Sequence, residues 1–252
     1  IFLRVFVLEN NRLIIVGGGH AGIEAALAAS RLGVKSTLIT MDRRAIGRLS
    51  CNPAVGGLAK SHLVKELDAL GGIMGVASDI NALQYKTLNK TKGRAVWSTR
   101  IQIDKKTYPV FIQNIINKDK NINVFEDEVI SLKIKKNKVV GVNTKNGSTL
   151  SCSAVVVTCG TFLNGLIHVG EKSFRAGRIG EVGSYGLTEH LISLGFFSGR
   201  LKTGTPPRIS KNSINLNKVD VAPGDKTFTP FSIMSTNNTL INNEDCFLVN
   251  TN

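Results

Sequence analysis

The sequence has 252 residues, of which 42% are hydrophobic and 20% charged, so it can bury a core in one large domain or one domain and part of another. No apolar stretch reaches the roughly 18–20 residues of a membrane-spanning helix, which excludes that class of protein. The net charge of +14 fits a polyanionic partner such as nucleic acid, and it equally fits the Lys- and Asn-rich composition that AT-rich genomes encode.

A strand, a glycine-rich turn, a helix and a second strand are predicted within the first 40 residues. Residues 13–16 form a continuous apolar run that is typical of a buried parallel strand. A helix is predicted over residues 23–32, where Gly33 suits its carboxyl end, and a second strand over residues 36–40. These elements make one βαβ unit, which indicates an α/β fold.

The turn between the first strand and the helix matches the G-x-G-x-x-G pattern of dinucleotide-binding loops. Gly17 permits the tight turn, Gly19 lets backbone N–H groups approach a pyrophosphate, and Gly22 lets the helix pack on the strand. The helix N-terminus adds the positive end of its dipole. The sequence therefore predicts a cofactor site over Gly17, Gly18, Gly19, His20, Ala21 and Gly22.

The acidic residue that would bind a ribose is expected at the end of the second strand. Thr40 ends that strand, and Asp42 follows two residues later. Asp42 is therefore either a ribose ligand or an ordinary loop residue, and the sequence leaves both open.

A loop with an unusual cysteine follows, and a helix is predicted over residues 58–70 from the spacing of Leu63, Leu67 and Leu70. Cys51 lies in this loop, in the run Ser-Cys-Asn-Pro-Ala-Val-Gly-Gly over residues 50–57. The helix N-terminus would lower the pKa of its thiol, and Arg48 and Lys60 would stabilise a thiolate. A buried, inert cysteine is the alternative.

The other cysteines, at positions 152, 159 and 246, form no zinc or CxxC spacing with Cys51 or with one another. The histidines show no metal-ligand spacing either. We therefore expect free thiols in a reducing compartment and no metal site.

The middle of the chain predicts a helix over residues 110–118 and then a β-meander over residues 129–158. Its first turn falls at Lys136-Asn137, and Asn146-Gly147 is a strong hairpin signal. The lysines at positions 133, 135, 136 and 138 indicate a solvated hairpin. Residues 154–158 predict a second buried parallel strand, which ends in Gly160 and Thr161 near the cofactor.

A meander before the returning strand favours an FAD-binding Rossmann-like domain of the glutathione-reductase type over a plain NAD dehydrogenase, in which helices fill that crossover. From residue 200 the chain is rich in Pro, Asn and Thr. We therefore predict an FAD-binding domain over residues 1–200 and the start of an inserted domain over residues 201–252.

Arg200, Lys202 and Arg208 lie among glycines and prolines over residues 199–208. Guanidinium groups on a rigid loop suit phosphate recognition, which predicts a nucleic-acid-binding segment. A solvated linker between domains is the alternative.

Four segments, residues 17–26, 50–57, 62–72 and 199–208, together resemble the MnmG (GidA) family, and the resemblance extends over residues 13–252. It implies an FAD-dependent enzyme that acts with the GTPase MnmE and adds a carboxymethylaminomethyl group at C5 of the wobble uridine of tRNA. It also implies methylenetetrahydrofolate as the carbon donor, glycine as the amino donor, NADH as the reductant, and a homodimer that assembles with MnmE.

The resemblance also implies roles for individual residues. The loop from Gly17 to Gly22 matches the FAD loop, and Val129 and Ser184 align with further FAD contacts. Cys51 matches one of two catalytic cysteines, whose attack on C6 of uracil would make C5 nucleophilic. Family members are much longer, so the second cysteine and the MnmE-binding region are absent from these residues, and we expect no activity from this piece alone.

Two other functions explain part of the pattern. A small-molecule flavin oxidoreductase accounts for the glycine loop but for neither the Cys-Asn-Pro loop nor the basic segment. A related folate-dependent tRNA uracil methyltransferase shares the glycine loop but lacks the Cys-Asn-Pro-Ala sequence. The expected compartment is a bacterial cytoplasm, or the mitochondrial matrix for a eukaryotic protein.

Overall fold

The computed structural model describes residues 12–50, 52–202, 204, 209–235 and 243–249. The chain divides into two compact units. Unit 1 comprises residues 1–48 and 112–200, and unit 2 comprises residues 49–111 and 201–252. The predicted boundary at residue 200 is one of these limits, but residues 49–111 group with the C-terminal segment, because Asp79 and Gln84 bind main-chain groups of that segment. That residues 1–200 bind FAD and that residues 201–252 begin an inserted domain stay predictions.

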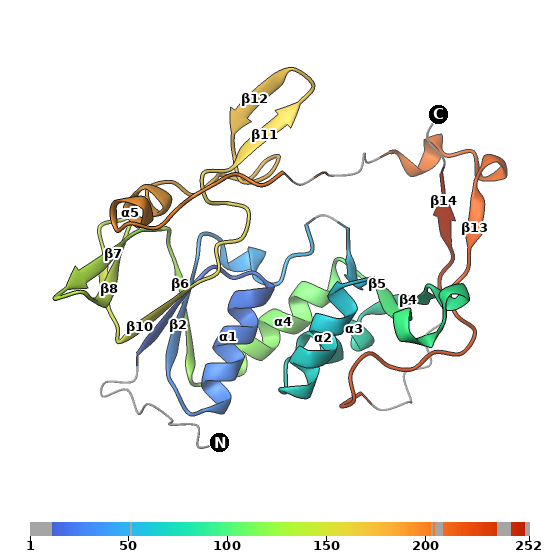
Figure 1. The fold of residues 1–252 in the computed structure, drawn as a ribbon, viewed down its shortest axis with the longest axis horizontal. Helices are drawn as coiled ribbons and strands as arrows, with labels where there is room; N and C mark the ends of the chain where they lie inside the picture. The colour runs from blue at the N-terminus through green and yellow to red at the C-terminus, as the bar shows by residue number, and fades with distance from the viewer. Residues whose placement is uncertain (1–11, 51, 203, 205–208, 236–242, 250–252) are drawn as a thin grey trace. The chain divides into compact units, whose positions relative to one another are not determined.

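A parallel four-stranded sheet forms the centre of unit 1 (Figure 1). Its strand order is β10 (Ala154–Val157), β1 (Leu13–Val16), β2 (Ser36–Thr40) and β6 (Ile122–Glu126). Ile14, Ile15 and Leu38 are at most 2% exposed, as expected for parallel strands that are covered on both faces. The predicted strands β1, β2 and β10 are confirmed, but β10 is less buried than predicted, since Val156 and Val157 are 37% and 39% exposed. The sequence analysis missed β6, whose polar Asn123 and Glu126 interrupt its apolar pattern.

Helix α1 (His20–Arg31) begins three residues earlier than predicted, directly after Gly19. It buries Ile23 and Ala26, and its carboxyl end is followed by Gly33 with φ of +73°. Left-handed backbone of this kind is the usual glycine conformation after a helix. Unit 1 also contains the short α5 (Leu187–Ser193), the three-ten turn η1 (Arg43–Ala45) and the hairpin of β11 (Leu166–Val169) and β12 (Lys172–Arg175).

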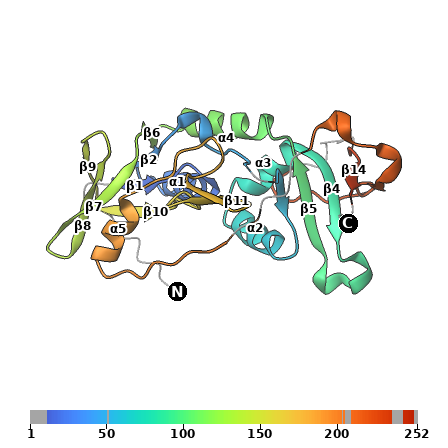
Figure 2. The ribbon, with the colours of Figure 1, turned by 90° about the horizontal axis from the view of Figure 1, so that it is seen from above.

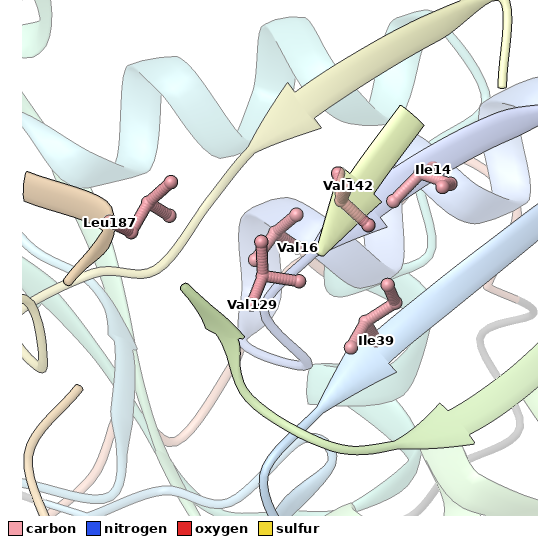
Figure 3. Close-up of a cluster of buried hydrophobic side chains, with 6 residues drawn as sticks. All are labelled: Ile14, Val16, Ile39, Val129, Val142 and Leu187. Carbon is pink, nitrogen blue, oxygen red and sulfur yellow. The ribbon is translucent and has the colours of Figure 1, made fainter. Parts of the chain in front are cut away.

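The predicted β-meander is confirmed as an antiparallel sheet of β7 (Val129–Lys135), β8 (Lys138–Thr144) and β9 (Thr149–Ser151). Lys136 and Asn137 have φ of 50° and 57°, which is the backbone of a tight type I′ hairpin turn. Figure 3 shows the buried cluster in which the meander, the parallel sheet and α5 meet. Its members are Ile14, Val16, Ile39, Val129, Val142 and Leu187.

Unit 2 is built on an antiparallel sheet with the order β3 (Ala54–Gly56), β5 (Ser98–Ile103) and β4 (Ala82–Leu88). The other elements are α2 (Lys60–Ala69), α3 (Met74–Ile80), the paired strands β13 (Asp220–Ala222) and β14 (Cys246–Leu248), and the three-ten turns η2 (Lys90–Lys92), η3 (Arg94–Val96), η4 (Lys211–Ser213) and η5 (Leu216–Lys218). The helix α4 (Thr107–Lys118), predicted as 110–118, continues from unit 2 into unit 1. Within the described ranges no helix has both the length and the hydropathy that a bilayer crossing requires.

The buried face of α2 differs from the predicted leucine spacing. Leu63 and Leu70 are 65% and 79% exposed, whereas Ser61, Val64 and Asp68 are buried. These three residues lie three, four and seven positions apart, so they also share one helix face. The helix is therefore confirmed, but polar residues supply much of the face that packs inward.

Buried carboxylates join the two segments of unit 2. Asp79 is 1% exposed and accepts hydrogen bonds from the Tyr85 hydroxyl (2.7 Å), the backbone N–H groups of Phe231 (2.7 Å) and Ser232 (2.9 Å), and the Ser235 hydroxyl. Burial, together with the hydrogen bond to Asp79, raises the pKa of Tyr85, so the phenol remains a donor. We call these hydrogen bonds to Asp79 the carboxylate clamp. It attaches the C-terminal segment to α3 and β4.

Candidate functional site

The glycine loop follows β1 at the point where the order of the sheet reverses. The chain leaves β1 for β2 on one side, and β10 returns on the other side of β1. Ligands of parallel α/β sheets bind at the carboxyl ends of the strands at such a point. Thr158, directly after β10, donates from its backbone N–H to the Val16 carbonyl (2.8 Å) and from its hydroxyl to the carbonyls of Val16 (2.9 Å) and Gly17 (3.1 Å). The sequence analysis gave Thr158 no role, because its partners lie more than 140 residues away in the sequence.

The three glycines of the motif differ in what surrounds them. A Cβ on Gly17 would lie 2.5 Å from the Thr158 carbonyl oxygen, and Gly17 has φ of +115°. A Cβ on Gly22 would lie 1.9 Å from the Gly17 carbonyl oxygen, whereas a Cβ on Gly19 would meet nothing within 4 Å. Gly17 and Gly22 are therefore required by the packing of strand, turn and helix. Gly19 instead borders open space, which is what a phosphate approaching the backbone needs.

The first turn of α1 faces the same region. Gly19 is the N-cap residue and supplies no side-chain hydrogen bond, and Ile23 N–H makes a helical bond to the Gly19 carbonyl (3.0 Å). The first N–H groups of a helix have no intrahelical acceptor, and the helix dipole makes this end positive. No acidic residue lies in the first turn. The loop and the helix end therefore fit the pyrophosphate of a dinucleotide.

The other predicted cofactor residues occupy different environments. Gly160, with φ of +61°, and Thr161 directly follow the strand end that contacts the glycine loop. Ser184 is buried, and its backbone N–H donates to the Phe162 carbonyl (2.9 Å) while its carbonyl accepts from Asn164 N–H (2.9 Å). The Val129 side chain packs in the core of Figure 3. Their contacts with a cofactor stay predictions.

The carboxylate of Asp42 is already bound by neighbouring residues of the protein. Its carboxylate caps η1 through Arg44 N–H (2.8 Å) and pairs with the guanidinium of Arg48 (3.3 Å), which also pairs with Glu181 (2.7 Å). Burial alone would raise the pKa of Asp42, but the hydrogen bonds from Arg44 and the charges of Arg44 and Arg48 hold it below its usual value. Asp42 therefore orders the loop after β2, and a ribose contact stays a prediction.

Cys51 lies outside the described residues, so its predicted catalytic role keeps only its sequence support. Arg48, one of the two cations expected near it, is engaged by the carboxylates of Asp42 and Glu181. The other, Lys60, donates to the Ala54 carbonyl (3.4 Å), and desolvation lowers its pKa.

The thiols of Cys152 and Cys159 have raised pKa values. Burial raises the pKa of the Cys152 thiol, and it raises the pKa of Cys159 to about 11. Because the thiolate is the nucleophile, neither residue is suited to attack an electrophile near neutral pH.

We predict that iodoacetamide alkylates Cys159 at pH 8 about 100-fold more slowly in the folded chain than in the denatured chain, because the folded thiol is almost fully protonated. Peptide mass spectrometry after timed quenching measures both rates. The folded-state rate should rise about tenfold per pH unit up to about pH 11. Equal rates in the folded and denatured chains at pH 8 would contradict the buried environment of this thiol.

The predicted nucleic-acid segment is only partly described. Arg200 and Lys202 are exposed, and Arg208 lies outside the described residues. Contacts of these cations with RNA therefore stay predictions. Across the portions of the chain with described structure, no group of three or more His, Cys, Asp or Glu residues could hold a metal ion.

Comparisons with known proteins are consistent with this architecture. The family described as Glucose inhibited division protein A (GIDA) matches residues 12–252. The tRNA uridine 5-carboxymethylaminomethyl modification enzyme MnmG of Flavobacterium psychrophilum is 45% identical over 244 residues, which are 97% of this chain and 39% of the relative. The protein of the same name from Sulfurihydrogenibium sp. is 50% identical over 222 residues, 87% of this chain and 36% of the relative.

A crystal structure of Aquifex aeolicus GidA (form I) has a TM-score of 0.88 and 42% identity to this chain, covering 94% of it and 40% of that protein. The predicted α/β fold class is thereby confirmed. The chain spans about two fifths of the length of the relatives it matches. With a family match that extends from residue 12 to residue 252, this chain belongs to the GIDA family.

Proposed function

We propose that the protein containing this chain is an FAD-dependent enzyme that modifies tRNA by adding a carboxymethylaminomethyl group at C5 of the wobble uridine. The observation that carries the proposal is the family match over residues 12–252, together with relatives that are named for this modification. Because the chain spans 39% of the first of these relatives, the activity is proposed for the whole protein.

Unit 1 is proposed to hold the adenosine and pyrophosphate part of FAD. The support is the open surface at Gly19, the uncapped first turn of α1 and the adjoining strand end at Thr158. Gly160, Thr161, Ser184 and Val129 are proposed as further contacts. FAD, when bound, would supply the redox chemistry of the reaction, with NADH as its reductant.

Cys51 is proposed as the nucleophile. Its thiolate would form a bond to C6 of uracil, which moves the C5–C6 π electrons to C5 and makes that carbon nucleophilic. C5 would then form its bond to the one-carbon unit of the carbon donor, and loss of the C5 proton would re-form the C5–C6 double bond and expel the thiolate. The raised pKa values of Cys152 and Cys159 favour Cys51 over these two cysteines, since buried thiols are poor nucleophiles.

The proposed substrates and partners follow the resemblance of the sequence. They are tRNA, methylenetetrahydrofolate as carbon donor, glycine as amino donor, a second copy of the protein, and an MnmE-type GTPase. Arg200, Lys202 and Arg208 are proposed to contact tRNA phosphates, and the proposed compartment is the bacterial cytoplasm, or the mitochondrial matrix in a eukaryote. The charge of +14 supports a polyanionic substrate.

Cells that lack the protein are expected to lose the carboxymethylaminomethyl group from their wobble uridines, as measured by mass spectrometry of tRNA nucleosides. The complete wild-type protein should restore it. The Cys51→Ser variant should bind FAD and tRNA normally but restore less than about 1% of the modification, because a hydroxyl is far less ionised than a thiol near pH 7. Cys246→Ser is the matched control and should restore the modification fully. Modification by Cys51→Ser would refute the role of Cys51, and unchanged nucleosides in the deletion strain would refute the function.

A further inference from the structure

The tip of the β4–β5 hairpin in unit 2 carries an exposed aromatic ring among cations. Residues 89–97 connect the two strands through η2 and η3, and Figure 2 shows these turns at the free end of the hairpin. Trp97 is the only tryptophan in the sequence and is 41% exposed, next to Val96, which is 43% exposed. Lys90, Lys92 and Arg94 precede it, and no acidic residue occurs between positions 89 and 97. The exposed part of this indole offers a surface on which a flat aromatic ligand can stack.

The ring of Trp97 is held in one orientation by the hairpin tip. Its indole N–H donates to the Lys90 carbonyl (3.2 Å), and its backbone N–H donates to the Arg94 carbonyl (3.2 Å). The Asn89 side-chain amide donates to the Val96 carbonyl (3.3 Å), which links the two ends of the hairpin tip. Asn89 and Gly93 have φ of 59° and 95°, and these left-handed positions allow two three-ten turns in succession. The surface is therefore preorganised.

The three cations of the hairpin tip differ in whether a carboxylate neutralises them. Lys90 pairs with the buried Asp225 at 2.9 Å, which anchors the tip to the C-terminal segment of unit 2. Lys92 is exposed and makes no ion pair with any residue in the described ranges, and the same holds for Arg94. The Arg94 guanidinium lies 5.6 Å from the centre of the Trp97 ring. The hairpin tip thus carries two positive charges that no carboxylate of the described residues pairs with, and one of them, on Arg94, lies over the indole.

We infer that Lys92, Arg94 and Trp97 bind single-stranded RNA, with one unpaired base stacked on the indole and neighbouring phosphates paired with the two cations. The inference rests on the proposed action on tRNA and names residues that would meet that substrate. Every base has a π face, so stacking on tryptophan requires no particular base. In a duplex the base faces are hidden in the stack, so this surface prefers single strands.

The first test is a fluorescence titration of the complete, FAD-loaded protein with a short oligouridylate and with an RNA duplex of equal nucleotide number. The oligouridylate should quench an emission component that is missing in Trp97→Phe, and the duplex should not quench it. Trp97→Ala should weaken oligouridylate binding about 5- to 150-fold, whereas Trp97→Phe should stay within about threefold of wild type because it keeps an aromatic face.

The second test measures how the affinity for oligouridylate depends on salt. Each phosphate contact on a single strand contributes about 0.7 to the slope of log affinity against log salt concentration, so Lys92→Ala and Arg94→Ala should each lower the slope by about that amount. Lys105→Ala is the matched control, because Lys105 is an exposed lysine of unit 2 outside the hairpin tip. Its slope should equal that of the wild type.

The outcomes separate the inference from the proposed function. If Trp97→Ala binds oligouridylate and unmodified tRNA as tightly as the wild type does, the inference is wrong while tRNA modification stands. Equal quenching by the duplex also overturns it. If the wild-type protein binds neither oligouridylate nor unmodified tRNA, both the inference and the proposed function fail. Should Trp97→Ala have a lowered melting temperature, the quenching difference between the wild type and Trp97→Phe decides the matter.

Discussion

A Gly22→Ala variant is expected to lose about 3 kcal/mol or more of the free energy of unfolding of unit 1. The added Cβ would lie 1.9 Å from the Gly17 carbonyl oxygen and 2.9 Å from the Thr158 hydroxyl, and the first of these is main chain that cannot rotate away. Helix α1 would have to move off the sheet. Thermal unfolding followed by circular dichroism should show a melting temperature roughly 6–12 °C lower, and the purified protein should lack flavin absorbance.

Gly19→Ala is the matched control for this prediction. Its Cβ meets nothing within 4 Å and the backbone φ of −77° suits any residue, so the melting temperature without cofactor should match the wild type. The methyl group instead occupies space that a pyrophosphate needs, so FAD affinity should fall about tenfold or more. An unchanged FAD affinity in Gly19→Ala would contradict the placement of the pyrophosphate at this glycine. A stable Gly22→Ala would contradict the packing argument.

An Asp79→Ala variant is expected to lose about 3–5 kcal/mol of the free energy of unfolding of unit 2, because the donors of the carboxylate clamp would be left buried without an acceptor. Urea unfolding measures the free energy, and limited proteolysis should show early cleavage within residues 201–252. Because Asp79 is 1% exposed, water cannot easily replace the lost acceptor.

Tyr85→Phe provides the graded comparison. It removes only the hydroxyl donor to Asp79 and keeps the ring that stacks on Phe228 at 4.2 Å between centroids. The expected loss is about 1 kcal/mol. If Asp79→Ala were no more destabilising than Tyr85→Phe, the backbone hydrogen bonds of Phe231 and Ser232 to Asp79 would have little importance for unit 2.

Local patterns predicted several elements of unit 1, although not β6, α5 or the hairpin of β11 and β12. The aliphatic run at residues 13–16, the glycine loop and the turn at Lys136-Asn137 each specify backbone geometry within a few residues, and the corresponding elements were predicted before the structure was known. The strands β4 and β5 were missed because polar residues such as Gln84 and Arg100 interrupt any alternation. Gln84 is buried because its amide donates to the carbonyls of Ala222 and Glu244, which are far away in sequence.

In the candidate site, too, features set by neighbouring residues could be predicted, and features set by residues far away in the sequence could not. The glycine loop could be predicted because its spacing is fixed by the turn itself. The hydroxyl bonds of Thr158 could not, since its partners Val16 and Gly17 are more than 140 residues away. Asp42 was equally ambiguous, because its pairing with Arg48 depends on how the loop after β2 folds.

The carboxylate clamp also bears on the order of events during translation. Asp79 and Phe231, whose backbone N–H donates to the Asp79 carboxylate, are 152 residues apart, and a ribosome adds about 5–20 residues per second. For roughly 8–30 s the nascent chain therefore exposes α2, α3 and the Asp79 carboxylate without the segment that satisfies them. Residues 112–200, which belong to unit 1, emerge within that interval. The segments of unit 1 in this chain can thus associate before the C-terminal segment of unit 2 reaches Asp79.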